Sequence, residues 1–355
     1  MLKKHINISR DKLAKKPKIL LLYTGGTIGM IKDYESNALK AFDFDHLHEN
    51  IPELNQIPCH IETVSFEKSI DSSNMNTSYF VKMIEIIEKH YNEKDGFVVL
   101  TGSDTMSYTS SAISFMIEAL GKPIIFTGSQ LPIGDLRTDA KENLITAIQI
   151  ASARDEYNLP IVKEVGLYFE YKLYRANRTT KINAEQFKAF TSPNLPPIAE
   201  SGVHLKFNNE LLYSSKENSK PIFRKKLEDR IVILKLFPGI TLQVVKSVLE
   251  IPSIKGVILE TYGSGNAPTN PRFIELLKEA IKKGIYIVNV TQCIGGSVIL
   301  GQYETSVQFK EIGVINGNDI TIESAVAKLM YMLGENMSRR EFKTIFEKPL
   351  RGEMS

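Results

Sequence analysis

Three short apolar runs in the first part of the chain each end in a Thr-Gly pair. The runs are "ILLLY", "FVVL" and "PIIF", and they continue into "TGGTIG", "TGSDTM" and "TGSQLP". Apolar residues fill consecutive positions rather than alternate ones, which is typical of strands that are buried on both faces of a parallel sheet. Longer helical patterns separate the runs, so the chain is predicted to be an α/β protein.

The expected elements follow this alternation. We expect strands at Ile19–Tyr23, Phe97–Leu100, Ile124–Thr127 and Val165–Phe169, and helices at Thr77–His90, Thr105–Leu120 and Asp139–Ala153. Because strands and helices alternate, the sequence predicts a larger N-terminal domain with three layers around a mostly parallel sheet.

A break in the pattern divides the chain. Residues 211–228 are polar and charged and contain a proline, which favours a linker. We predict an N-terminal catalytic α/β domain over residues 1–210, a linker over 211–228, and a smaller C-terminal three-layer α/β domain over 229–355. Its parallel strands are expected in "RIVILKLF", "GVILETY" and "IYIVNVT", and its helices at Thr241–Glu250, Pro271–Lys283 and Ile322–Leu333.

Composition argues against several classes of function. The net charge is only +3 over 355 residues and the chain has no Trp, so no nucleic-acid partner is expected. No signal peptide or membrane-length apolar run is visible, and no membrane association is expected. Cys59 and Cys293 are too few and too distant for a disulfide framework, which favours a cytoplasmic location. The histidines do not follow zinc-site spacings, so we expect no metal and no cofactor.

The segments that follow the strands carry residues suited to acyl transfer. In parallel sheets, ligands bind outside the carboxyl ends of the strands, so these segments are expected to meet. Thr27 on a glycine turn is a candidate nucleophile, if backbone amides hold the oxyanion and a base takes its proton. Lys181 can be that base, and Asp104 can orient it or bind an ammonium group. The set predicts amide or ester hydrolysis.

Simpler interpretations exist for each segment. "TGGTIG" can be a tight packing turn, and it lacks the Gly-Lys-Ser/Thr ending of a phosphate loop. In "TGSDTM", Ser103 or Asp104 can cap the helix that follows. Lys181 taken alone is more simply interpreted as a surface lysine, because lysine is seldom buried. The joint occurrence of four such segments after strands favours a catalytic site.

The same segments resemble a known family. "YTGGTIGM", "DSSNM", "TGSDTM", "GKPIIFTGSQLP", "LYRANRTTK", "YGSGNAPTN" and "LRGEM" are similar to motifs of the bacterial type I, cytoplasmic L-asparaginases, over roughly residues 19 to 353. The resemblance implies hydrolysis of L-asparagine to L-aspartate and ammonia. It also implies a homodimer or homotetramer and no metal.

The resemblance also assigns roles to individual positions. Thr27 matches the family's nucleophile, and Ser103, Asp104 and Lys181 match its second catalytic set. The positions that match substrate-binding residues are Gly26, Asp71, Ser72, Ser73, Gly102 and Thr127. Replacement of Thr27 by alanine is therefore expected to abolish turnover while leaving the fold intact.

Some positions depart from the family pattern. Ser103 replaces a threonine and keeps the hydroxyl, whereas Asn74 replaces an aspartate and removes a charge near the substrate. A tyrosine commonly serves the first threonine, and Tyr303 is favoured over Tyr34 for this role.

A regulatory asparagine site of the type I enzymes is matched only in part. Thr180 and Cys293 fit that candidate site. Glu260 stands where an arginine is expected, and this reversed charge should hinder binding of an α-carboxylate.

Competing functions share the fold or parts of it. A mixed glutaminase-asparaginase differs only in tolerating one more methylene. An amidotransferase subunit is expected to have an additional domain before the first strand. A non-catalytic amino-acid-binding protein and a nucleotide-binding module are the remaining alternatives.

Overall fold

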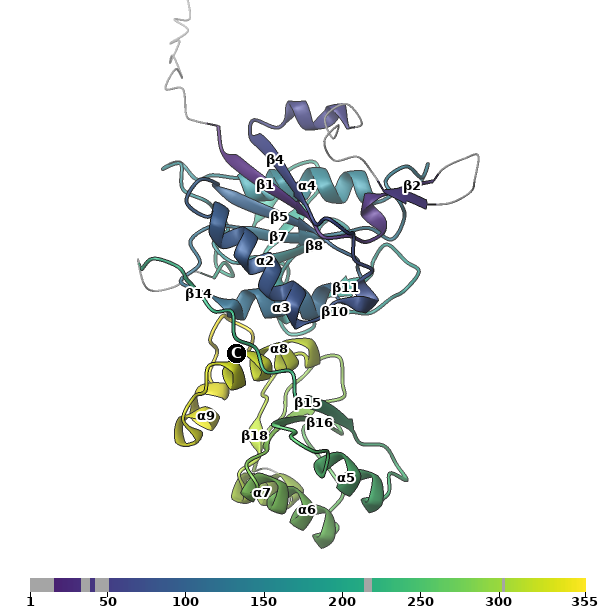
Figure 1. Cartoon of the computed structure of the whole chain (residues 1–355), viewed down its shortest axis with the longest axis vertical. Coiled ribbons are helices and arrows are strands. Elements are labelled where there is room, and N and C mark those ends of the chain that lie inside the picture. The colour runs from purple at the N-terminus through teal and green to yellow at the C-terminus, as the bar shows by residue number, and fades with distance from the viewer. Residues whose placement is uncertain (1–15, 33–38, 42–50, 214–218, 302–303) are drawn as a thin grey trace, which may run out of the picture.

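A larger, mostly parallel sheet and a smaller parallel sheet organise the chain in the computed structural model, which describes residues 16–32, 39–41, 51–213, 219–301 and 304–355 (Figure 1). The N-terminal sheet has eight strands in the order β13-β12-β9-β8-β7-β5-β1-β4. The C-terminal sheet has four strands in the order β15-β16-β17-β18. The predicted α/β class, with a larger N-terminal and a smaller C-terminal sheet, is confirmed.

The centre of the N-terminal sheet consists of the four predicted strands. These are β1 (Lys18–Tyr23), β5 (Gly96–Leu100), β7 (Ile124–Thr127) and β8 (Val165–Phe169). All pair in parallel, and Tyr23, Leu100 and Thr127 are successive partners across the sheet. The turns that follow them therefore leave the sheet at one edge, as predicted.

The outer strands were not predicted. They are β4 (His60–Ser65), β9 (Lys172–Arg175), β12 (Ala199–Ser201) and β13 (Leu205–Phe207). β4 pairs in parallel with β1, whereas β9, β12 and β13 pair antiparallel. β4 has no fully buried residue, so it lacks the continuous apolar run that marks the central strands.

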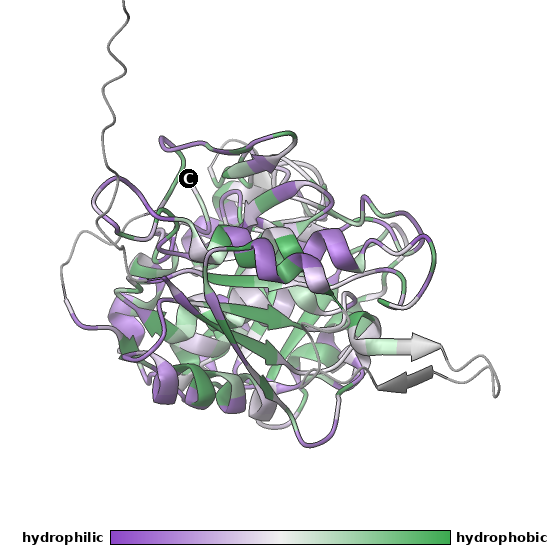
Figure 2. Ribbon diagram, turned by 90° about the horizontal axis from the view of Figure 1, so that it is seen from above, coloured by the Kyte–Doolittle hydropathy of each residue, from purple (hydrophilic) through white to green (hydrophobic). Residues whose placement is uncertain are grey.

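Helices cover both faces of the N-terminal sheet. α2 (Thr77–His90) and α3 (Met106–Met116) pack in one apolar cluster with Leu20, Phe97 and Val99, and α4 (Ala140–Ser152) packs in another with Leu21 and Val98. Adjacent strand residues thus face opposite layers. Figure 2 shows the apolar strands inside and hydrophilic helix faces outside.

Helix α3 ends four residues before its predicted end. Its last residue is Met116, and the next two residues form β6 (Ile117–Glu118). β6 pairs antiparallel with β14 (Ile222–Phe223), which lies within the predicted linker. Strand pairing with a distant segment overrides the local helical pattern here.

The C-terminal sheet is parallel throughout. Its strands are β15 (Ile231–Lys235), β16 (Gly256–Thr261), β17 (Tyr286–Thr291) and β18 (Ile315–Asn316). The surrounding helices are α5 (Leu242–Leu249), α6 (Pro271–Lys282), α7 (Glu304–Ile312), α8 (Ile322–Gly334) and α9 (Arg339–Phe346).

Helix α8 joins the two parts of the molecule. Tyr331 of α8 stacks on Phe115 of α3 with ring centroids 6.2 Å apart, and one apolar cluster continues from α3 through α8 to the C-terminal sheet. Figure 1 shows α8 directly beneath α3. The part of the chain that the structure describes has no helix long and apolar enough to cross a membrane.

Candidate active site

The turn after β1 requires both of its glycines. Gly25 and Gly26 have φ of +138° and +89°, values that side chains rarely adopt. A Cβ atom on Gly26 would lie 2.4 Å from the backbone nitrogen of Gly102. The turns after β1 and β5 therefore pack backbone against backbone. Thr27 follows, half-buried, as the first residue of the short 3-10 helix η1 (Thr27–Gly29).

Tyr23 supports this turn from below. Its hydroxyl donates hydrogen bonds to the carbonyl oxygens of Gly29 (3.3 Å) and Gly26 (3.4 Å). Burial raises the pKa of Tyr23 to about 12, so the hydroxyl stays protonated and donating. The tyrosines expected to serve Thr27, Tyr303 and Tyr34, both lie outside the described residues. The position of Tyr23, directly before the turn, was the available signal.

A cavity of about 430 Å³ opens at this edge of the N-terminal sheet. It is lined by residues from every segment that the sequence analysis selected. Those among the predicted site residues are Gly26, Thr27, Asp71, Ser72, Gly102, Ser103, Asp104 and Lys181. The predicted nucleophile and its predicted partners thus share one cavity.

Lys181 makes the central charged contacts of this cavity. It lies on the short strand β10 (Thr180–Lys181), and its Nζ donates to Ser103 Oγ at 2.9 Å and Asp104 Oδ1 at 2.7 Å. The lysine side chain is only 15% exposed, whereas that of Asp104 is 68% exposed. The lysine is thus shielded beside a hydroxyl, and the carboxylate is open to solvent and to ligands.

Asp71 and Ser72 form another wall. Asp71 caps the 3-10 helix η4 (Ser72–Asn74), because its Oδ1 accepts from the backbone N–H of Ser73 (2.9 Å) and the Ser73 hydroxyl (2.8 Å). These hydrogen bonds lower the pKa of Asp71, so it remains ionised in mild acid. Ser73 is exposed and does not line the cavity. The Thr105 hydroxyl donates to the Ser72 carbonyl at 2.9 Å and holds this wall against the turn after β5.

Thr127 is set apart from the other predicted residues. It is fully buried, and its hydroxyl donates to the carbonyl of Tyr168 at 2.9 Å. Ser129 and Gln130, which follow in the same segment, line the cavity instead.

Gln130 was missed in the sequence analysis. Its Oε1 accepts a hydrogen bond of 3.3 Å from Ser103 Oγ, and its Nε2 donates to the carbonyl of Gln186 at 3.0 Å. Its backbone N–H donates to the carboxylate of Asp139 at 3.0 Å. Gln130 thus orients the hydroxyl that also contacts Lys181. Its place in "TGSQLP", after a strand end, was the signal.

The candidate regulatory residues lie in different settings. The Thr180 hydroxyl donates to Glu323 Oε1 at 2.6 Å, whereas Cys293 is an exposed free thiol. Glu260 is 5% exposed, and its carboxylate lies 3.2 Å from the Nζ of Lys235.

The described residues contain no cluster of three or more histidine, cysteine or carboxylate side chains that could hold a metal ion. The cavity instead presents hydroxyls, a shielded lysine and two carboxylates. Such a set suits nucleophilic attack on a carbonyl, with proton transfer by side chains.

Comparison with known proteins gives this site a family. A family model described as asparaginase, N-terminal, matches residues 18–213, and the glutaminase/asparaginase C-terminal domain matches residues 230–346. The chain belongs to the asparaginase family. Within this family it is 40% identical over 342 residues to L-asparaginase 1 of Escherichia coli K12, and the match covers 96% of this chain and 99% of that protein.

Further relatives of this family member extend the comparison. The crystal structure of L-asparaginase I from Vibrio cholerae has a TM-score of 0.86 and 37% identity, and the match covers 96% of this chain and 99% of that one. The 60 kDa lysophospholipase of Mus musculus is 38% identical, over 95% of this chain and 62% of that protein. The family fold is thus shared by proteins with different names.

Proposed function

We propose that this member of the asparaginase family hydrolyses L-asparagine to L-aspartate and ammonia, with Thr27 as the nucleophile. One observation carries the proposal: Thr27, on its glycine turn, shares a cavity with the hydrogen-bonded set of Lys181, Ser103 and Asp104. The names of the Escherichia coli and Vibrio cholerae relatives support the same reaction.

The reaction proceeds in two steps. In the first, the Thr27 hydroxyl oxygen forms an ester bond with the amide carbonyl carbon of the asparagine side chain. The C–N bond of that amide breaks, and ammonia leaves with the proton from the threonine. In the second, water attacks the ester, aspartate leaves, and Thr27 recovers its proton. The hydrogen-bonded pair of Ser103 and Lys181 relays these protons, because hydroxyl and amine lie 2.9 Å apart.

The remaining walls of the cavity suit the two charged groups of an amino acid. The carboxylates of Asp71 and Asp104 attract the α-ammonium group, and Asp71 stays ionised because the Ser73 hydrogen bonds lower its pKa. Ser72 and the backbone of the turns offer donors to the α-carboxylate. Discrimination against glutamine rests on one methylene, which is worth only about 1–3 kcal/mol.

The decisive test is ammonia release by the purified protein from L-asparagine, D-asparagine and L-glutamine in parallel. Release from L-asparagine well above the other two supports an asparaginase. Comparable release from L-glutamine would assign the mixed glutaminase-asparaginase class. Binding of asparagine without ammonia release would contradict the proposal and favour the amino-acid-binding alternative.

We also propose that the chain is a cytoplasmic homodimer or homotetramer, divided into domains at residues 211–228. Exposed apolar side chains support self-association. Phe237, Val244 and Ile251 in the C-terminal part are 53%, 46% and 43% exposed. Light scattering on the eluting protein tests this assembly, and a monomeric mass would contradict it.

A further inference from the structure

One contact between the two halves of the chain lies directly beside the catalytic lysine. Thr180 precedes Lys181 on β10, and its hydroxyl donates a 2.6 Å hydrogen bond to Glu323 Oε1. Glu323 lies in the first turn of α8, on the C-terminal side of the molecule. A single peptide unit thus separates this contact from the lysine that reaches Ser103.

The carboxylate of Glu323 is enclosed. Glu323 is 9% exposed, and burial raises the pKa of its carboxyl group. Tyr108 lies near this carboxylate. Burial, and after it the charges of Glu323 and Glu260, raise the pKa of Tyr108 to about 12. In such a shielded place a hydrogen bond is stronger than at the surface, and an unpaired partner is costly.

The residues before Thr180 are also held by the C-terminal part. Arg178 of the 3-10 helix η5 (Ala176–Arg178) forms a buried ion pair of 2.6 Å with Asp319 and donates to the carbonyl of Gly352 at 2.9 Å. Asn177 Nδ2 donates to the carbonyl of Arg351 at 3.1 Å. These contacts approach the same segment from the tail of the chain.

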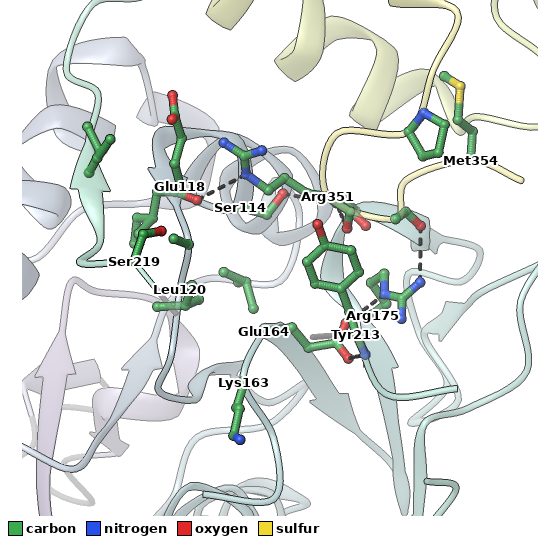
Figure 3. Close-up of a pocket in the computed structure, with 17 residues that line it drawn as sticks. Ser114, Glu118, Leu120, Lys163, Glu164, Arg175, Tyr213, Ser219, Arg351 and Met354 are labelled. Atoms are coloured by element: carbon green, nitrogen blue, oxygen red, sulfur yellow. Dashed lines mark hydrogen bonds and ion pairs between the residues drawn. The ribbon is translucent and has the colours of Figure 1, made fainter. Parts of the chain in front are cut away.

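Figure 3 shows how this tail meets the N-terminal part. Arg351 and Arg175 lie around one cavity of about 650 Å³, and Arg175 Nη1 donates to the carbonyl of Gly352 at 3.2 Å. Arg351 Nε donates to the carbonyl of Ile117, just after α3, at 3.0 Å. The tail therefore binds both the η5 segment and the end of α3.

The N-terminal part holds Lys181 from the other side. β10 pairs antiparallel with β11 (Phe190–Thr191), in which Lys181 is opposite Phe190. Phe190 in turn packs against Phe169 of β8 with ring centroids 5.0 Å apart. β11 therefore sets the direction of this two-residue strand, and Glu323 provides a side-chain anchor on its first residue.

We propose that Glu323 is a positioning residue for Lys181 and that it acts through the hydroxyl of Thr180. This inference rests on the proposed function, which makes Lys181 part of the catalytic set. The contact sets where β10 lies against α8, and so where Lys181 Nζ meets Ser103 Oγ. A small displacement of a catalytic group slows the chemical step far more than it weakens substrate binding.

Variants at both ends of the hydrogen bond test the inference. Glu323→Ala is expected to lower kcat about ten- to a hundredfold with little change in KM, because the lining residues Asp71 and Ser72 are untouched. Glu323→Gln keeps an acceptor oxygen in the same place and should restore kcat. Thr180→Val should lower kcat as Glu323→Ala does, and the double variant should lose no more than either single one.

Glu341→Ala is the matched control. Glu341 is also a first-turn glutamate, on α9, but it is exposed, and its carboxylate accepts a local hydrogen bond from Ser338 Oγ at 2.7 Å. Its kcat and KM should equal those of the starting protein. If removal of any first-turn glutamate lowered kcat, Glu341→Ala would show the same loss as Glu323→Ala.

Each outcome decides a stated point. A folded Glu323→Ala protein with unchanged kcat overturns the inference. If that variant does not fold, Thr180→Val decides, and full activity in it overturns the inference as well. A double variant much slower than either single variant would show that Glu323 and Thr180 act independently, and this result also contradicts the inference. Absence of ammonia release from the starting protein overturns the proposed function and this inference together.

Discussion

Each part of the molecule has a lysine–carboxylate pair near the ends of its strands, but the exposure of the two partners is reversed. At the N-terminal site the side chains of Lys181 and Asp104 are 15% and 68% exposed. At the end of β15 the side chain of Lys235 is 61% exposed, and that of its partner Glu260 is 6% exposed. The shielded lysine faces a cavity with hydroxyls, and the exposed one neutralises a buried carboxylate. A lysine and a carboxylate near strand ends can therefore have different roles in the two parts of the molecule, depending on which partner is shielded.

The strand-end threonines of the two sheets differ in the same way. Thr27 lies half-buried on a glycine turn and lines the cavity. Thr291, the last residue of β17, donates its hydroxyl to the carbonyl of Gly263 at 2.6 Å and accepts from the backbone N–H of Cys293 at 3.0 Å. Both hydrogen bonds of the Thr291 hydroxyl thus stabilise backbone turns, at Gly263 and Cys293. This difference favours Thr27 over Thr291 as the proposed nucleophile.

Replacing the two lysines should break this comparison most strongly. Lys181→Met keeps an unbranched side chain, one atom shorter, but removes the amine that contacts Ser103, so kcat should fall about a hundred- to ten-thousandfold. Lys235→Met, the matched control, should leave kcat near that of the starting protein. Steady-state ammonia release measures both. Equal losses in the two variants would contradict the contrast.

A fully buried pair in the C-terminal part should affect stability. Lys328 and Glu353 are both 0% exposed and 2.5 Å apart, and Lys328 also donates to the carbonyls of Phe346 (2.6 Å) and Lys348 (2.7 Å). Lys328→Met removes the cation beside the buried Glu353 carboxylate, which keeps hydrogen bonds from the backbone N–H groups of Leu350 and Arg351. The change should lower the free energy of unfolding by about 3–5 kcal/mol. Urea unfolding measures this change.

The control for that variant is an exposed lysine pair. Lys246 of α5 and Glu250, the residue directly after this helix, lie 3.9 Å apart, and both side chains are about half exposed. Lys246→Met should change the free energy of unfolding by less than about 1 kcal/mol. A similar loss of unfolding free energy in Lys328→Met and Lys246→Met would show that burial does not determine how much these ion pairs contribute to stability.

Acid should weaken the link between Arg178 and Asp319. Burial would raise the pKa of Asp319, but hydrogen bonds from Ser355 and the Arg178 guanidinium outweigh it and lower the pKa below 3.8. The unfolded chain then binds more protons, so this stabilisation is present above pH 3.8 and is lost as pH falls through the folded value. The Tm deficit of Asp319→Asn should therefore shrink in that range. A deficit independent of pH would contradict this assignment.

The smallest effect is expected at the tyrosine beneath the nucleophile turn. Tyr23→Phe removes two long hydrogen bonds to Gly26 and Gly29 but keeps the ring, so kcat should fall less than about tenfold. Tyr157→Phe, at a residue that is 75% exposed, is the control and should have no effect. A loss as large as that of Lys181→Met would mean that the Tyr23 hydroxyl takes part in the chemistry.

Much of the fold followed from local patterns. Helix α2 occupies the predicted residues, and the four central strands match because each is buried on both sides. β4 escaped prediction because it is an edge strand of mixed exposure. The early end of α3 depends on pairing with β14, more than a hundred residues later, which local patterns do not report.

The site was predictable where residues follow strand ends. Thr27, Ser103 and Asp104 could be selected because parallel strands deliver their carboxyl ends to one edge. Lys181 reaches the same cavity by another route, because the antiparallel strand β9 and the 3-10 helix η5 lie between β8 and this lysine. The position of Gln130 after a strand end was visible in the sequence, but its contact with Ser103 depends on the direction of its side chain, which the sequence does not report. Glu323 contacts a residue 143 positions away, so only the packing of α8 against the N-terminal part reveals it.

The central claim concerns which threonine carries the chemistry. Turnover of L-asparagine should be compared in Thr27→Ala and Thr291→Val, with folding checked by circular dichroism. The account predicts a loss of at least about a thousandfold for Thr27→Ala and activity near that of the starting protein for Thr291→Val. Substantial steady-state turnover by a folded Thr27→Ala protein would contradict the account.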